Sequence, residues 1–318
     1  MRLIEGLSAL QALDLRAALG DGPQSRSVVA VGVFDGVHLG HQRLLHDLLE
    51  MSARLPGVPT VVTFKNHPDQ VLRGGAPPLL VSVPHRLRLL RRAGVQRLVL
   101  LDFEPRLQQM TAREFAEDLL VGRLRASGLL LGYDSALGKD REGTPARFQD
   151  LGAELGFEVR IGEPFVVDGL AVSSTRIRTA IQSGDLELSK RLLGRNPSTF
   201  GVVERGFGRG HDLGFPTANV RPETPALPPH GVYAILAILD GNVLPGIANL
   251  GVRPTFGGDQ ATALLEVHLF DFHGDLYGRE LEVGFVAAIR AERKFDSARE
   301  LQQQIARDLE HARACLRA

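Results

Sequence analysis

Short apolar runs and amphipathic stretches alternate through the first half of the chain. Val28–Phe34 is apolar and rich in β-branched residues, and Asp35-Gly36 interrupts it. A helical repeat of leucines follows from about His41. Similar apolar runs occur at Val58–Phe64, Arg97–Phe103, Leu129–Asp134 and Phe157–Ile161. Strands that alternate with helices at this spacing predict an α/β unit with a doubly wound parallel sheet.

Other stretches of this half predict helices. Pro84–Ala93 is basic and amphipathic, which predicts a helix with a solvated, arginine-rich face. Thr111–Leu120 opens with Thr-Ala-Arg-Glu, a pattern typical of a capping box. The residues before Val28 form a lead-in with weakly helical character at Leu7–Leu19.

The pattern changes after Gly194. Apolar strand-like runs now follow one another at short intervals between Gly/Pro turns, at Phe200–Val203, Gly231–Leu239, Val243–Asn249, Ala263–Phe272 and Glu280–Arg290. This predicts an antiparallel β-barrel. Asp296–Leu316 closes the chain as an amphipathic helix, for which Leu301, Ile305 and Leu309 are the expected buried stripe. We therefore expect two domains, 1–194 and 195–318.

Composition narrows the classes of function. The 318 residues include 37 Lys+Arg and 37 Asp+Glu, and this neutral balance argues against a general nucleic-acid binder. The single cysteine, Cys315, allows no internal disulfide, which suits the cytoplasm. No apolar run is long enough for a membrane helix. We expect small-molecule substrates, no nucleic-acid partner and no membrane partner; the oligomeric state does not follow from the sequence.

The segment His38-Leu-Gly-His41 lies where a strand gives way to a helix. Free backbone N–H groups and the helix dipole favour an anion at such a point. Two imidazoles add donors for phosphate oxygens, and Gly36 and Gly40 allow close approach to the backbone. The histidines could also be turn residues or a metal pair, but no third ligand stands at a standard metal spacing.

Two more segments follow predicted strands or begin helices. His67 follows the strand Val58–Phe64, and a loop role or a site role is equally compatible with its position. Ser173 and Ser174 begin a helix, which suits capping. Together with Arg178 they could instead grip a phosphate, because arginine supplies forked donors.

The second half carries a glycine-rich segment, Gly206–Asn219. It resembles a phosphate-wrapping loop but lacks the Gly-Lys-Ser/Thr of a P-loop. Thr217 and Asn219 offer two oxygen ligands, and Mg²⁺ is usually held by few protein oxygens together with substrate phosphates. Glu266 interrupts an apolar strand and is a candidate base for a hydroxyl group. It could also simply point outward from an edge strand.

These motifs resemble those of the bifunctional riboflavin kinase/FMN adenylyltransferases, the prokaryotic FAD synthetases. The first half is similar to their adenylyltransferase module through Gly32–His41, Thr63–Pro68 and Ser173–Arg178. The second half is similar to their kinase module, above all through Leu213-Gly-Phe-Pro-Thr-Ala-Asn219. The resemblance implies a nucleotidyltransferase-type sheet followed by a kinase barrel.

The resemblance also implies roles for individual residues. Glu266 matches the base that acts on the ribityl hydroxyl, His38 and His41 the groups that stabilise developing charge, and Arg178 the grip on the leaving group. Mg²⁺ is implied at Thr217 and Asn219, with ATP and flavins as substrates. The residues implied in binding ATP or flavin are Gly32, Phe34, Asp35, Gly40, His67, Asp134, Ser174, Thr175, Gly206, Gly208, Gly210, Phe215, Thr217, Asn219 and Arg253.

The chain departs from the family pattern in places. Gly132–Gly138 lacks the aromatics of the usual Phe-x-Phe-Gly, and His211 replaces a common arginine. The first departure motivates an alternative in which only the kinase is active and the first half is a scaffold. A flavin-binding protein without turnover is a further alternative, although a base beside a metal site argues against it.

Overall fold

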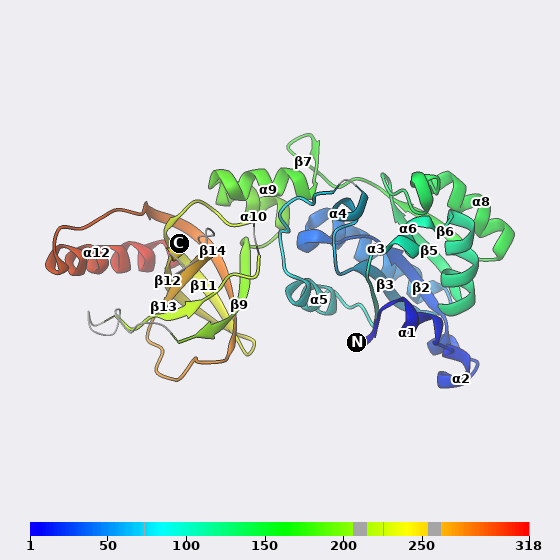
Figure 1. Ribbon diagram of the computed structural model, residues 1–318, viewed down its shortest axis with the longest axis horizontal. Coiled ribbons are helices and arrows are strands. Elements are labelled where there is room, and N and C mark those ends of the chain that lie inside the picture. Colours follow the sequence, from blue (N-terminus) through cyan, green and yellow to red (C-terminus); the bar gives the residue numbers. More distant parts are fainter. Residues whose placement is uncertain (73, 206–214, 225, 254–261, 318) are drawn as a thin grey trace. The chain divides into compact units, whose positions relative to one another are not determined.

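The structure, a computed structural model, describes residues 1–72, 74–205, 215–224, 226–253 and 262–317. The chain forms two compact units (Figure 1). The first unit contains Met1–Pro77 and Val83–Ser173, and the second contains Pro78–Ser82 and Ser174–Ala318. The segment 174–194 therefore packs with the barrel. The expected functional boundary between residues 194 and 195 stays a prediction.

A parallel sheet forms the centre of the first unit and confirms the predicted α/β class. Among the described residues its strands stand in the order β1-β4-β3-β2-β5-β6, and every pairing is parallel. The strands are β1 (Arg2–Glu5), β2 (Ser27–Val31), β3 (Val58–Phe64), β4 (Arg97–Leu101), β5 (Ala126–Gly132) and β6 (Glu158–Gly162). Strands β2, β3 and β4 are buried along their whole length, as continuous apolar runs require.

Helical segments connect these strands. They are α1 (Leu7–Gln11), α2 (Leu15–Leu19), η1 (Pro23–Ser25), η2 (Asp35–Val37), α3 (Leu39–Arg54), α4 (Pro68–Leu72), α5 (Val83–Arg92), α6 (Pro105–Gln109), α7 (Ala112–Glu114), η3 (Phe115–Arg123), η4 (Lys139–Arg141) and α8 (Pro145–Leu155). A small hairpin, β7 (Val166–Val167) with β8 (Leu170–Ala171), lies near the end of the unit. Thr111 caps α7 in the expected capping box with Glu114.

The lead-in was only partly predicted. Residues Arg2–Glu5 form the edge strand β1, which pairs with β4, in a segment for which no strand was predicted. The opposite edge, β6, is charged: Glu158 pairs with Arg54 of α3 at 2.9 Å, and Arg160 lies 3.5 Å from Asp47 of the same helix. The edge strand β1 has four residues and β6 has five. Ion pairs connect β6 to α3.

The second unit is built on a closed antiparallel barrel, as predicted. Its strand order is β10-β13-β12-β11-β14-β9, and β9 pairs back to β10. The strands are β9 (Ser198–Glu204), β10 (Ala218–Val220), β11 (Gly231–Leu239), β12 (Asn242–Arg253), β13 (Thr262–Leu269) and β14 (Glu280–Ala291). Strand β10 lies in a segment expected to be a loop. Leu265, Val267, Leu250 and Phe285 are among the residues that fill the barrel interior.

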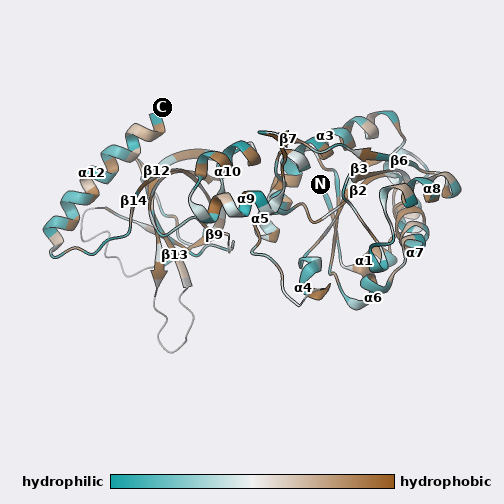
Figure 2. Ribbon diagram, turned by 90° about the horizontal axis from the view of Figure 1, so that it is seen from above, coloured by the Kyte–Doolittle hydropathy of each residue, from teal (hydrophilic) through white to brown (hydrophobic). Residues whose placement is uncertain are grey.

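Helices α9 (Ser174–Ser183), α10 (Leu186–Leu193) and α12 (Ala298–Arg317) complete this unit. Helix α12 is amphipathic, with hydrophilic and hydrophobic residues interleaved along it (Figure 2). The expected buried stripe is wrong in detail. Leu301, Ile305 and Leu309 are only half-buried, whereas Asp308 and Ala312 are the buried positions. Ala312 packs on the outside of the barrel with Ile247 and Phe270. None of the described helices is long and apolar enough to span a membrane.

Candidate functional sites

A strained turn links β2 to α3 in the first unit. Phe34 and Val37 have φ values of 54° and 41°, and Gly36 has a φ of 80°. Positive φ is uncommon outside glycine and unusual for a β-branched residue such as Val37. Such conformations persist where the surrounding structure enforces them, and they cluster at functional sites. The turn ends at His38, the N-cap of α3.

The two imidazoles of His38 and His41 lie face to face at the start of α3. Their ring centroids are 3.6 Å apart with planes inclined by 17°, and the Phe34 ring lies 5.2 Å from His41. The His41 backbone N–H donates to Nδ1 of His38 at 3.3 Å, which leaves Nε2 as the protonated nitrogen of a neutral His38 ring. A Cβ at Gly40 would come within 3.2 Å of the His38 ring, so glycine lets the ring lie there.

Burial holds the pKa of His41 well below its usual value, and the adjacent His38 and the Arg86 guanidinium lower it further. The residue as a whole is half-buried, but its Nδ1 is enclosed and has no hydrogen-bond partner among the described residues. The imidazole of His41 is therefore neutral near pH 7. A neutral imidazole can donate one N–H to a phosphate oxygen. The described residues contain no cluster of three His, Cys, Asp or Glu side chains that could hold a metal ion.

A cavity of about 670 Å³ opens at the carboxyl ends of the parallel strands. It lies where the strand order reverses between β2 and β5, the usual place for a ligand in an open α/β sheet. Gly32, His67 and Asp134, which the sequence singled out, all line it. His38 and His41 are not among the residues that line it.

Aromatic rings line the same cavity. Phe64 and Phe103 meet edge to face with centroids 5.6 Å apart, and Phe115 adds a third ring. Ser135 and Leu137, which stand where the family pattern has aromatics, also line it. The apolar surface for a planar ligand therefore comes from other strand ends.

Sequence reasoning missed two side chains that organise these strand ends. The arginine-rich face of Pro84–Ala93 was expected to be solvated, but Arg86 in this helix is only 1% exposed. Asn66 joins the ends of β3 and β4, since its amide donates to the Phe103 carbonyl at 3.0 Å and accepts from the Phe103 N–H at 2.8 Å. Arg86 shares a helical face with Leu89 and Leu90, a spacing that could have indicated its burial.

Ser174, Thr175 and Arg178 belong to the second unit, at the start of α9. Arg178 is buried, and its Nε donates to the Pro78 carbonyl at 2.6 Å. Thr175 is exposed, and Ser174 is half-buried. Their grip on a phosphate stays a prediction.

The second unit brings polar side chains into a row across neighbouring barrel strands. Glu266 on β13 stands directly opposite Asn219 on β10 and opposite Asn249 on β12. Directly opposed residues on adjacent strands project to the same face. Because Leu265 and Val267 fill the barrel interior, this row faces outward. Asn249 was not singled out from the sequence.

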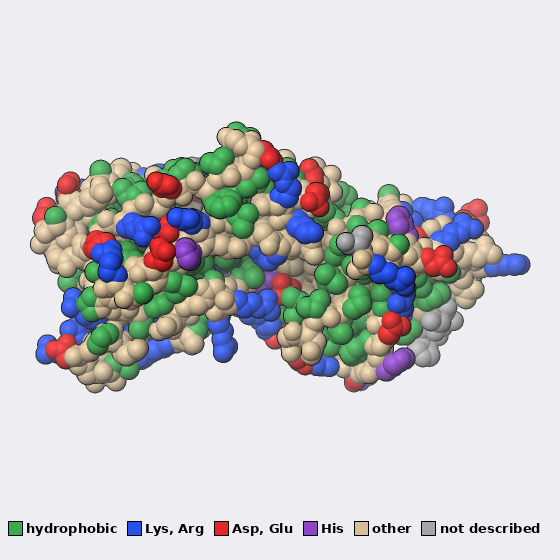
Figure 3. All heavy atoms as spheres, turned by 180° about the vertical axis from the view of Figure 1, so that it is seen from behind, with side chains coloured by type: hydrophobic (Ala, Val, Ile, Leu, Met, Phe, Trp, Pro, Cys, Tyr) green, Lys and Arg blue, Asp and Glu red, His purple; other side chains and the backbone are tan. Residues whose placement is uncertain are grey.

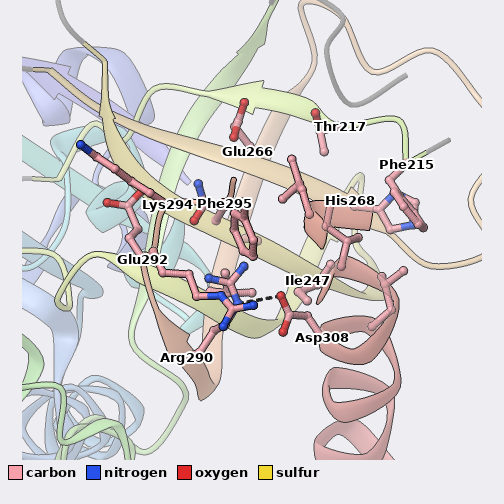
Figure 4. A pocket seen from close by; sticks show the side chains of 17 residues that line it. Phe215, Thr217, Ile247, Glu266, His268, Arg290, Glu292, Lys294, Phe295 and Asp308 are labelled. Carbon is pink, nitrogen blue, oxygen red and sulfur yellow. Dashed lines mark hydrogen bonds and ion pairs between the residues drawn. The ribbon is translucent and has the colours of Figure 1, made fainter. Parts of the chain in front are cut away.

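Glu266 and Asn249 of this row line a cavity of about 800 Å³ on the outside of the barrel. Thr217 and Glu266 lie at one end of it, and Arg290 and Asp308 at the other (Figure 4). Arg290 Nε donates to Asp308 at 2.8 Å, which ties α12 to β14 across the cavity floor. Leu301, Ile305 and Leu309 of α12 contribute apolar wall. The cavity therefore has polar or charged side chains at both ends and an apolar wall from α12.

Glu266 is half-buried rather than enclosed among apolar neighbours. It does point outward from the barrel, but β13 is no edge strand, since it pairs with both β10 and β12. Outward here means into the cavity. A carboxylate between two amides, open to a cavity, is well placed to accept a proton from a bound hydroxyl.

Thr217 and Asn219 fit a magnesium ion in their donor chemistry. Ala218 and Val220 belong to the barrel interior, so the two residues that alternate with them face the outer side with Glu266. A hydroxyl and an amide oxygen are hard ligands, and both side chains are half-buried. Few protein oxygens with room for phosphates and water are what Mg²⁺ prefers.

Some expected binding residues fall outside the described structure. Gly206, Gly208, Gly210 and His211 are not among the described residues, and of Arg253 only the backbone, at the end of β12, is described. Phe215 does line the cavity, where its ring lies 6.4 Å from that of His268. The His268 Nδ1 lies 2.8 Å from the Pro216 carbonyl oxygen.

Charged side chains of both signs intermingle on the face drawn in Figure 3. Lys and Arg residues stand there among Asp, Glu and apolar residues. A surface of this kind does not provide the continuous basic stripe that nucleic-acid binding uses.

Comparisons with known proteins agree for both halves of the chain. Residues 21–176 match the family model of FAD synthetase, and residues 193–316 match that of riboflavin kinase. Relatives from Pseudomonas fluorescens, Escherichia coli K12 and Bacillus subtilis are 39%, 38% and 34% identical to this chain. The alignments cover 99%, 97% and 91% of this chain and 97%, 96% and 92% of those proteins. Each relative is described as a bifunctional riboflavin kinase/FMN adenylyltransferase.

A solved structure shares the fold over the whole length. The crystal structure of a Streptococcus pneumoniae protein described as a macrolide-efflux protein matches with a TM-score of 0.81 and 31% identity. The match covers 98% of this chain and 99% of that one. Neither family model nor any of the three relatives carries a description of efflux.

Proposed function

The chain belongs to the family of bifunctional riboflavin kinase/FMN adenylyltransferases, and from this premise we propose that its two cavities are the sites of the two reactions. The barrel cavity is the riboflavin kinase site. The strand-end cavity of the first unit, with the imidazole pair, belongs to the FMN adenylyltransferase site. The observation that carries the proposal is the placement of Glu266, which stands opposite two amides on adjacent strands, in the wall of a large cavity.

The protein makes FMN and then FAD. In the first reaction, riboflavin and ATP give FMN and ADP. In the second, FMN and another ATP give FAD and pyrophosphate. Neither reaction requires a covalent intermediate with the protein, so positioning and charge stabilisation supply most of the rate enhancement.

In the barrel site the ribityl 5′-hydroxyl lies against Glu266. The carboxylate takes the hydroxyl proton as the oxygen bonds to the γ-phosphorus of ATP, and the bond from that phosphorus to the bridging oxygen breaks to release ADP. The amides of Asn219 and Asn249 flank Glu266 and orient it. The apolar wall from α12 covers the flavin ring.

A magnesium ion bound by Thr217 and Asn219 would neutralise charge on the ATP phosphates. Glu266 stands directly across from Asn219, so the base and the phosphates are brought to one end of the cavity. Phosphoryl transfer needs the attacking hydroxyl oxygen and the leaving oxygen of ADP roughly in line through the γ-phosphorus, with the base within reach of the hydroxyl proton.

In the first unit, the FMN phosphate attacks the α-phosphorus of ATP, and the bond to the pyrophosphate leaving group breaks. His38 and His41 donate N–H groups to the phosphoryl oxygens at the start of α3, where the helix dipole also favours anions. Gly32, Phe34, Asp35 and Gly40 shape this strand–helix junction. His67 and Asp134 stand at the cavity that takes FMN. That Ser174, Thr175 and Arg178 bind the leaving group stays a prediction from the family resemblance.

The alternatives gain no support. A scaffold without adenylyl transfer is at odds with the match of residues 21–176 to FAD synthetase, and a passive flavin carrier has no use for Glu266. The substrates are riboflavin, FMN and ATP. As part of the proposal we place the enzyme in the cytoplasm, because its one cysteine, Cys315, is free.

Replacing Glu266 with glutamine tests the barrel site. Glu266→Gln keeps the size of the side chain but removes its capacity as a base, so kcat for FMN formation should fall by about 10²–10⁴-fold. Riboflavin binding, followed by flavin fluorescence, should remain near that of the parent protein. FAD formation from added FMN should also be unchanged, because it occurs in the other unit.

Glu204 provides a matched control. It stands opposite Asn219 on the other side of the same row, on β9, and pairs with Arg221 at 3.2 Å. Glu204→Gln should leave FMN formation near the parent rate. The proposal fails if Glu266→Gln retains full turnover, or if both variants lose it equally.

A further inference from the structure

Arg86 on α5 is a buried cation that the proposed mechanism does not use. Its side chain is 1% exposed, and burial lowers its pKa to about 10 although the nearby Asp35 carboxylate acts in the opposite direction. A buried charge costs several kcal/mol unless its partners compensate. Its Nε is enclosed and has no hydrogen-bond partner among the described residues.

The guanidinium of Arg86 grips two strand ends. It donates to the Val33 carbonyl at 2.8 Å and to the Phe64 carbonyl. Phe64 is the last residue of β3, and Val33 follows the end of the adjacent strand β2. Both residues also line the 670 Å³ cavity. A planar fork can join two carbonyls in this way, whereas a single ammonium group cannot fix both in one plane.

Each gripped residue leads directly into a functional segment. Val33 precedes the strained turn Phe34–Val37, and this turn leads into the start of α3, where His38 and His41 lie. Phe64 precedes the loop that carries His67, and Thr63 also donates to the Val33 carbonyl at 3.0 Å. Arg86 is thus a common anchor for both segments. Its charge also reaches the imidazole pair, because it contributes to lowering the pKa of His41.

A second buried arginine provides the comparison. Arg97 on β4 is 3% exposed, and burial lowers its pKa to about 10 as well. It donates to the Gln24 carbonyl at 2.7 Å and the Arg26 carbonyl at 3.1 Å. These partners lie at the amino ends of the strands, opposite the cavity. Arg97 has the same kind of burial and the same kind of acceptors, but no functional segment follows them.

We propose that Arg86 is a positioning residue of the adenylyltransferase reaction, which holds the ends of β2 and β3 so that the imidazole turn and the His67 loop keep their reactive arrangement. This rests on the proposed site in the first unit. Arg86 contacts no substrate in this role. It acts through the backbone of Val33 and Phe64.

The test compares Arg86→Lys and Arg86→Met with Arg97→Lys and Arg97→Met in the full-length chain. FAD formation from added FMN, ATP and Mg²⁺ is measured beside FMN formation from riboflavin, which serves as the internal reference. Both Arg86 variants should lower kcat for FAD on the order of 10²-fold, since misplacement by about 1 Å costs that much. FMN formation should be unchanged, and the Arg97 variants should keep the parental ratio of the two activities.

The pH dependence of FAD formation distinguishes the effect of the Arg86 charge from the effect of its forked geometry. Arg86→Met removes a cation near His41, so the acid limb of FAD formation should move to higher pH. Arg86→Lys should leave that limb nearly in place, because the charge remains while the fork is lost. The Arg97 variants should not move it.

Several results would overturn the proposal. Parental FAD formation by Arg86→Lys and Arg86→Met would show that the fork is not needed. Equal loss of both activities, or failure of Arg86→Lys to fold while Arg97→Lys folds, would make Arg86 a stability residue only. A parent protein that makes no FAD from FMN and ATP would instead refute the proposed function itself.

Discussion

The ion pair between Arg290 and Asp308 should hold α12 on the barrel. The Asp308 carboxylate is 4% exposed, and it accepts from Arg290 at 2.8 Å and from the Gln304 amide at 2.7 Å. Asp308→Asn keeps the shape of the side chain but removes its charge. The Arg290 guanidinium then stays in a mostly enclosed place without its anion.

The size of the effect follows from that burial. Breaking a buried pair by removing one partner costs about 3–5 kcal/mol. Arg290 keeps 20% of its side chain exposed and also donates to the Ala291 carbonyl, so we take the lower end, about 3 kcal/mol. For a unit of about 150 residues this corresponds to a fall in Tm of roughly 6–12 °C.

Function should change together with stability. Leu301, Ile305 and Leu309 of α12 form wall of the kinase cavity, so a loosened helix should raise the KM for riboflavin. Formation of FAD from added FMN should be unaffected. Calorimetry measures the stability change, and amide hydrogen exchange along α12 shows whether the helix itself loosens.

The same helix supplies a control. Arg313 pairs with Asp271 at 3.0 Å, but the Asp271 side chain is 79% exposed and that of Arg313 is 40% exposed. Asp271→Asn should therefore leave Tm nearly unchanged, because exposed pairs contribute little. Equal shifts in Tm for Asp308→Asn and Asp271→Asn would refute the reasoning, since burial would then have no bearing on the cost.

Two further predictions concern His41. His41→Ala should lower FAD formation by ~100-fold or more through loss of one transition-state stabiliser, and it should spare FMN formation. Assaying both products from one preparation checks this, and equal loss of the two would contradict the separation of sites. The lowered pKa of His41 also predicts acid sensitivity, because the unfolded chain takes up this proton at higher pH than the folded one. As pH falls below about 6.5, the free energy of unfolding of the first unit should decrease by at most about 1.4 kcal/mol per pH unit from this group. Thermal melts at pH 7 and about pH 5.5 measure the loss, and a His41→Gln variant with the same pH dependence would contradict the assignment.

The periodicity of the sequence predicted most of the architecture because burial and periodicity are closely linked. Short apolar, β-branched runs such as Val58–Phe64 are typical of strands covered on both faces, and this one is buried along its whole length. The edge strand β1 was not predicted, because a strand of four residues with one buried position has almost no hydrophobic periodicity. Strand β10 was not predicted either, because it follows a glycine-rich segment. Its pairing with β9 and β13 also depends on residues distant in sequence.

The candidate sites were only partly predictable for a similar reason. His38 and His41 stand within one local motif, so their proximity followed from the sequence. The row of Asn219, Glu266 and Asn249 depends on the register of separate strands, and no local pattern points to Asn249. Arg86 was misplaced because a charged residue on an amphipathic helix is usually solvated. Its acceptors are the backbone carbonyls of Val33 and Phe64, and the amino-acid sequence does not indicate which backbone carbonyls accept hydrogen bonds from a side chain.

The margins of the two β structures also bear on how the protein behaves at high concentration. Addition of a strand from another molecule at β6 would require breaking the ion pairs Glu158–Arg54 and Arg160–Asp47. At the other margin, β1 offers a template of only four residues. The barrel closes on itself and presents no open ladder among its described strands. Intermolecular strand pairing, a common first step of aggregation, is therefore disfavoured at the margins of the six-stranded sheet and of the barrel.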